Sequence, residues 1–196
     1  MKKKTIITAA LILALLLLVG GAIAYFTDKE TVGNVFTVGK VDIKLEETAW
    51  DETKAENLVP GEAVKKNPTI VNIGTVDAYA FMVVEVPCAG DREVFKFDFQ
   101  REWTGFELGT CQDGLATRVY YYGTGGTLKK LTVGQTTEPL FSIAEMIYDL
   151  TPEEAEDISK TINVYGYGIQ ADGITNTTPS NVWTLFNNSG NSNSGS

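Results

Sequence analysis

The side chains that commonly carry catalysis are poorly represented in this chain of 196 residues, which contains no histidine. This absence excludes Ser-His-Asp and Cys-His triads and the HExxH zinc motif. Paired carboxylates occur at Asp51-Glu52 and over residues 153–157. The first pair lies in a predicted loop, and the second group is typical of the first turn of a helix. The sequence therefore predicts no catalytic residue, no metal ligand and no cofactor.

The two cysteines, Cys88 and Cys111, lack the spacing of a metal site. In an exported protein an even pair favours one disulfide, which would stabilise the fold by about 3 kcal/mol through loop closure. Two separate thiols, buried or on the surface, are the alternative that the sequence leaves open.

The first 24 residues have the three parts of a signal peptide. Three lysines at positions 2–4 precede an apolar block at 11–19, and the small residues Ala22 and Ala24 frame a cleavage site before Tyr25. An uncleaved transmembrane helix is the alternative, since the uncharged run is long enough to span a bilayer. Two glycines interrupt the run ahead of the site, however, and no basic cluster follows it. We expect cleavage after Ala24 and a secreted protein, associated with the membrane only through its signal peptide.

Charge excludes one large class of partners. Loss of the three lysines with the signal peptide would lower the net charge from −9 to −12. Such a surface repels nucleic acid and anionic lipid headgroups, so we expect no nucleic-acid partner.

The remaining chain reads mainly as strands. Alternating or continuous apolar patterns recur at residues 34–47, 69–87, 94–99, 118–123, 128–134 and 161–171, with a turn at 72–77 that leaves a buried strand at 78–86. Helices are predicted only at 142–149, at 151–160 and over 179–186, where Trp183 and Phe186 would pack on the core. Together these elements favour an all-β, antiparallel β-sandwich of jelly-roll type over residues 39–186. Residues 187–196 read as a disordered tail.

Aromatic side chains gather in two strands, Tyr120-Tyr121-Tyr122 and Phe95, Phe97 and Phe99. They could form a ligand face, for instance for carbohydrate, but aromatic residues in strands more often pack in the core, and we interpret them so. The GTGG sequence at 123–126 is interpreted as a hairpin turn, because no helix follows it as a phosphate loop would require.

Four short motifs point to a family by their order and by the place of the first one, directly after the cleavage site. They are Tyr25-Phe26-Thr27-Asp28 with Asn34-x-Phe36-Thr37-x-Gly39-x-Val41-Asp42-Ile43, then Leu58-Val59-Pro60-Gly61-Glu62, then Asn72-Ile73-Gly74-Thr75, and finally Tyr167-Gly168-Ile169-Gln170-Ala171-Asp172-Gly173. The chain resembles the TasA/camelysin family of exported proteins over residues 1–87 and again near the C-terminus. The resemblance implies a jelly-roll sandwich and processing by a SipW-type signal peptidase.

For TasA-like members the resemblance further implies fibres of a bacterial biofilm matrix. In such fibres the segment after the cleavage site adds as a strand to the neighbouring subunit. Here this donor segment would be residues 25–38, anchored by Phe26, Val35, Phe36 and Val38, with a hinge at Gly39, where the alternating pattern changes phase. The partner would be the protein itself, in a head-to-tail polymer.

Two other functions remain open. The protein could be a monomeric cell-surface binding module whose N-terminal segment folds back as its own edge strand. It could also be a camelysin-type metallo-endopeptidase, but without histidine no family motif transfers to this chain. We expect a structural protein that is not an enzyme.

Overall fold

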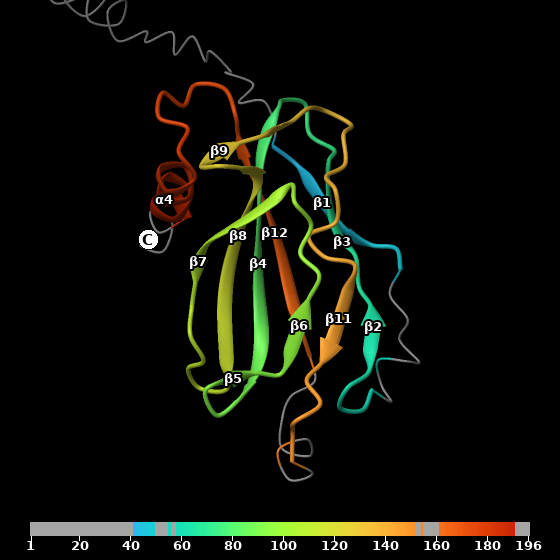
Figure 1. Cartoon of the computed structure of the whole chain (residues 1–196). Helices are drawn as coiled ribbons and strands as arrows, with labels where there is room; N and C mark the ends of the chain where they lie inside the picture. The colour runs from blue at the N-terminus through green and yellow to red at the C-terminus, as the bar shows by residue number, and fades with distance from the viewer. Residues whose placement is uncertain (1–40, 50–54, 56–57, 152–153, 155–160, 191–196) are drawn as a thin grey trace, which may run out of the picture. The chain divides into compact units, whose positions relative to one another are not determined.

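The computed structural model describes residues 41–49, 55, 58–151, 154 and 161–190 (Figure 1), all of which belong to one compact unit. This part of the chain contains the strands β1 (Ile43–Glu47), β2 (Ala63–Lys65), β3 (Pro68–Asn72), β4 (Ala78–Ala89), β5 (Arg92–Glu93), β6 (Phe95–Phe97), β7 (Trp103–Leu108), β8 (Leu115–Thr124), β9 (Thr127–Leu128), β10 (Lys130–Leu131), β11 (Ile143–Met146) and β12 (Asn163–Gln170), and the helix α4 (Pro179–Gly190). None of its helices is long and apolar enough to cross a membrane.

The larger sheet is built around β4, the continuous apolar strand. On one side β4 pairs with β12, from Asn163 opposite Glu85 to Gln170 opposite Ala78. On its other side it pairs with β8, which in turn pairs with β7. All these pairings are antiparallel, and the strand order is β12-β4-β8-β7. The short β10 continues this sheet beside the beginning of β4.

The second sheet is assembled from shorter pieces. Strand β3 pairs with β1, and β11 pairs with both β2 and β6. Residues 137–142 bridge these pieces, because Thr137 N–H donates to Ile70 C=O and Leu140 N–H donates to Pro68 C=O. The two sheets pack face to face (Figure 1), which confirms the predicted all-β antiparallel sandwich.

Strand β4 supplies side chains to two cores, because successive residues of a strand point to opposite faces. Ala80, Met82, Val84 and Val86 pack against the second sheet, in a core that includes Ile70, Trp103, Phe141 and Met146. Tyr79 and Phe81 point to the outer face and pack with α4.

The helix α4 makes a third layer on this outer face. Trp183 stacks on Phe81 with ring centroids 5.2 Å apart, and Phe186 lies against Tyr167 at the same distance. The predicted packing of Trp183 and Phe186 is thus confirmed. The helix continues to Gly190, so the prediction of disorder was wrong for residues 187–190. Residues 191–196 lie outside the described part of the chain.

The predicted helix at residues 142–149 is also wrong. Residues 143–146 form β11, in which Ala144 and Met146 are buried while Ile143 and Glu145 are exposed. This period of two matches a strand between β2 and β6, and the pairing on both sides outweighs the local helical preference. Of the helix predicted at 151–160, only Thr151 and Glu154 are described. They exchange the two hydrogen bonds of a capping box, of 2.9 and 3.2 Å.

The aromatic strands are mainly core, as predicted. Tyr120, Tyr121 and Tyr122 are all buried, as is Phe95, whereas Phe99 is 36 % exposed. The GTGG sequence joins β8 to β9, with Thr124 opposite Thr127, and is therefore the predicted hairpin turn.

Candidate functional site

The outer edge of β12 is an open row of backbone hydrogen-bonding groups. Ala171 N–H donates to Asp77 C=O, so in an antiparallel ladder the residues of odd number bond β4. The backbone groups of Val164, Gly166, Gly168 and Gln170 therefore point away from β4. Within the described residues no strand pairs with this edge. Such an edge is a template for another strand.

Two glycines bring a second strand close to this edge. A Cβ atom at Gly168 would lie 2.5 Å from Cγ2 of Ile43 and 3.0 Å from Cγ1 of Val41, whereas at Gly166 the nearest atom, Cδ1 of Ile43, would be 3.3 Å away. The absence of a side chain at Gly168 is thus what allows the start of β1 to pack here. The described chain begins at Val41, beside the open edge of β12.

A groove borders the same edge on the outer face. It has a volume of about 390 Å³ and is lined by the end of β12 and by Ile174, Leu185 and Phe186. A strand added to β12 would place alternate side chains on the two faces of the sheet. One set would face this groove and the other would face the side of the sheet on which Ile43 packs.

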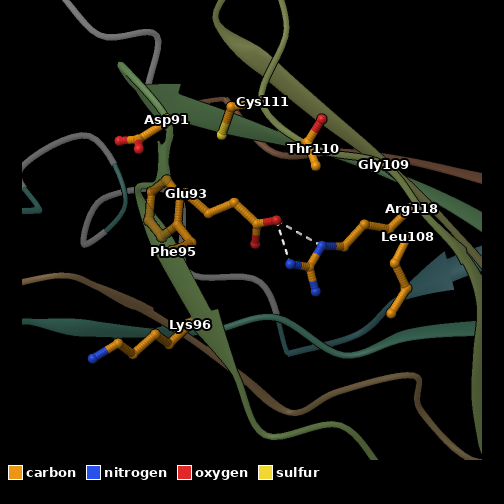
Figure 2. Close-up of a pocket in the computed structure, with 9 residues that line it drawn as sticks. All are labelled: Asp91, Glu93, Phe95, Lys96, Leu108, Gly109, Thr110, Cys111 and Arg118. Atoms are coloured by element: carbon orange, nitrogen blue, oxygen red, sulfur yellow. Dashed lines mark hydrogen bonds and ion pairs between the residues drawn. The ribbon is translucent and has the colours of Figure 1, made fainter.

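A separate cavity of about 530 Å³ lies beside the disulfide (Figure 2). In its wall Arg118 Nε donates to Glu93 Oε1 over 2.7 Å, and Arg118 Nη2 pairs with the same carboxylate. Asp91 and Lys96 point away from this pair (Figure 2). The charge on Arg118 is thus already compensated by Glu93 within the wall of the cavity.

Arg118 and the neighbouring Tyr120 both have raised pKa values. Burial acts to lower the pKa of Arg118, but the Tyr120 hydroxyl and the Glu93 carboxylate outweigh it and raise the pKa. Burial raises the pKa of Tyr120, against the opposing effect of Arg118. Neither group is tuned to exchange a proton near pH 7, so the cavity has no candidate general base among them.

The predicted site residues fall into two groups. Cys88 and Cys111 form a disulfide in the structure, with an S–S distance of 2.03 Å, and link the end of β4 to the segment between β7 and β8. The cleavage-site residues Ala22, Ala24 and Tyr25 lie outside the described residues. So do Phe26, Val35, Phe36, Val38 and Gly39, and their predicted roles stay predictions.

Sequence reasoning did not single out the edge of β12. The signal that could have found it is the Gly166-Tyr167-Gly168 sequence, because glycine inside a strand often marks close approach of another backbone.

A resident metal ion has no suitable donor set in the described part of the chain, where no group of three His, Cys, Asp or Glu side chains could hold one. The sequence has no histidine, and both cysteines are in the disulfide. The residues that the structure describes therefore do not fit a zinc centre with three protein ligands.

The fold and the edge define an antiparallel β-sandwich whose glycine-containing border strand, β12, pairs with β4 on one side and with no other strand of the described residues on its outer side. In sequence, residues 1–100 match the family model described as camelysin metallo-endopeptidase. This match covers half of the chain, which therefore belongs to the camelysin family, as its resemblance to TasA and camelysin indicated. No curated protein matches the chain. The family description names a metallopeptidase. Our expectation that this chain is not an enzyme stays a prediction.

Proposed function

We propose that this protein is a secreted structural subunit that forms extracellular or biofilm matrix fibres by strand donation. After cleavage at Ala24 by a SipW-type signal peptidase, the segment 25–38 of one copy adds to the outer edge of β12 in the next copy. The observation that carries this proposal is the open edge of β12 with its bordering groove. Four residues there point backbone groups away from β4 that no strand in the described part of the chain pairs with, and a donated strand would satisfy them.

The apolar residues of the donor segment suit the two faces of this edge. Phe36 and Val38 are two residues apart and would share one face, while Val35 would point to the other. One face offers the groove next to Phe186 and Ile174. A contact of this kind does not close on itself, so it propagates as a filament.

The monomeric binding module is the competing function, and it would use the same edge in cis. The described chain begins at Val41, beside Gly168, so its own upstream segment could reach β12 as well. The two functions therefore differ in whether the added strand belongs to the same copy or to another.

Two variants of the mature chain separate these functions. Deletion of residues 25–38 removes the donor but keeps the acceptor edge. Gln170→Pro removes an N–H that points away from β4, which edge strands tolerate, and so blocks the acceptor while keeping the donor. Gln170→Ala is the matched control because it keeps the N–H.

Negative-stain microscopy and sedimentation provide the readout. We expect filaments from the unmodified mature chain and from Gln170→Ala, and none from either blocked variant alone. The deletion variant mixed with Gln170→Pro should give a heterodimer of one copy each, because only one donor and one acceptor remain. Monomers at every concentration and no heterodimer in the mixture would refute strand donation. Circular dichroism verifies that each variant is folded.

The peptidase function is tested on the same preparation. Cleavage of casein by the pure mature chain that stops on addition of a chelator would support it, and we expect none.

A further inference from the structure

Part of the outer face of the larger sheet is not covered by α4. The rings of Phe81 and Tyr167 lie under the helix. One row further along the strands, Tyr165 is 42 % exposed and lies opposite Val83. In the next row Asn163, Glu85 and Thr117 lie side by side on β12, β4 and β8. We call Tyr165, Asn163, Glu85 and Thr117 the Tyr165 face.

The polar groups of the Tyr165 face are held in place by one another. Glu85 Oε2 accepts hydrogen bonds from Asn163 Nδ2 over 3.0 Å and from the Tyr165 hydroxyl over 3.1 Å. Within the described residues, no hydrogen bond reaches Glu85 Oε1 or Asn163 Oδ1. Two acceptor oxygens are thus oriented by the network and still available to a ligand.

The ring of Tyr165 is positioned by the same network. Its bond to the Glu85 carboxylate raises the pKa of the Tyr165 hydroxyl, so this group stays protonated at neutral pH. The hydroxyl is therefore fixed as a donor to Glu85, and the exposed ring is kept beside the row formed by Asn163, Glu85 and Thr117. Because the three residues of that row sit on adjacent strands, they are spaced by about 4.8 Å.

This combination is suited to a particular class of ligand. A pyranose has an apolar C–H face that packs on an aromatic ring and a rim of hydroxyl or amine donors that carboxylate and amide oxygens accept. We propose that the Tyr165 face binds a segment of polysaccharide made of neutral or amino hexoses. Glu85, with Glu107 exposed on the neighbouring β7, disfavours acidic sugars and phosphorylated ligands by like-charge repulsion. A polysaccharide chain also matches the open shape of a sheet face.

The proposal does not depend on strand donation. Two residues of the Tyr165 face belong to β12, but their side chains project from the outer surface of the larger sheet, whereas the proposed donor strand would bond the backbone at its edge. A glycan-binding monomer and a glycan-binding fibre would share it.

The test is binding of the full mature chain to defined glycans. Cellohexaose represents a neutral chain, a hexamer of glucosamine an amino-sugar chain, and a hexamer of galacturonate the acidic comparison, each measured by isothermal titration calorimetry. We expect binding of at least one of the first two and none of the third. Tyr165→Ala should weaken that binding at least tenfold, and Tyr165→Phe should weaken it less because the ring remains.

Two further variants make the result specific. Glu85→Gln keeps an acceptor oxygen but loses the charge, and it should weaken binding of the amino sugar more than binding of cellohexaose. Tyr148→Ala is the matched control, because Tyr148 is 74 % exposed outside the Tyr165 face, and it should change nothing. Absence of binding to both non-acidic glycans, or equal binding by wild type and Tyr165→Ala, would overturn the proposal. So would a preference for galacturonate, which would point to a cationic site elsewhere.

Discussion

The contact between Gly168 and Ile43 can be tested by a double-mutant cycle. A Cβ atom at Gly168 would sit 2.5 Å from Cγ2 of Ile43, closer than carbon atoms approach in folded proteins. Gly168→Ala should therefore push β1 away from β12, and overpacking of this kind typically costs about 1–3 kcal/mol. Alanine regains about 0.5–1 kcal/mol by restricting the unfolded chain. We expect a net loss of about 1–2 kcal/mol in the free energy of unfolding.

Ile43→Ala removes the atom that causes the clash. Ile43 is half-buried, so the substitution alone should cost about 2 kcal/mol, at the lower end of the range for buried isoleucine. In the double variant, the Cβ of residue 43 would lie 3.6 Å from the new Cβ, an ordinary contact, although Cγ1 of Val41 stays at 3.0 Å. The double variant should therefore lose about 1 kcal/mol less than the sum of the two single variants.

Urea denaturation followed by tryptophan fluorescence measures these differences. Gly166→Ala is the matched control on the same strand, because its nearest neighbour would be 3.3 Å away and could shift. We expect that variant to differ from wild type by less than about 0.5 kcal/mol. Additive losses at Gly168 and Ile43, or an equal loss at Gly166, would show that these glycines do not set the approach of β1 to β12.

Three further predictions concern stability. Asn72 is fully buried; its side chain donates to Val76 C=O and Leu131 C=O and accepts from Gly74 N–H. Asn72→Ala leaves these groups unpaired and should lower the free energy of unfolding, measured in urea, by about 3 kcal/mol. A loss below about 1 kcal/mol would show that these hydrogen bonds contribute little to stability. The disulfide spans 23 residues, so the double Cys88→Ser, Cys111→Ser variant should lose about 3 kcal/mol, and a reductant should destabilise only the wild type. The hydrogen bond from Thr151 N–H lowers the pKa of Glu154 from its ordinary value of 4.5. The stability that this bond contributes is therefore present above pH 4.5 and is lost as the pH falls through the lowered pKa of Glu154. Glu154→Gln should therefore make stability less dependent on pH below 4.5, and an unchanged acid profile would refute this.

The sandwich could be predicted because its pattern is local. The apolar run that became β4 and the alternation that became β1 are visible in the sequence, and so is the i, i+3 pair of Trp183 and Phe186 in α4. Each depends on the period of two in a strand or of 3.6 in a helix.

What could not be predicted depends on partners distant in sequence. Residues 143–146 become a strand only because β2 and β6 lie on both sides of them. The open edge of β12 is visible only when every neighbour of that strand is known. The network of Glu85, Asn163 and Tyr165 joins residues 78 and 80 positions apart, a distance that no motif spans.

The same separations determine when the molecule can finish folding. Strand β12 pairs with β4 across about half the length of the chain, and α4 follows every strand of the larger sheet in sequence. The aromatic outer face of the larger sheet is therefore shielded from water only once α4 has packed on it. Pairing between residues so far apart in sequence slows folding, because distant contacts require loop closure before they stabilise. A chain truncated before Pro179 would leave the rings of Phe81 and Tyr167 exposed to water, as an apolar surface prone to aggregation.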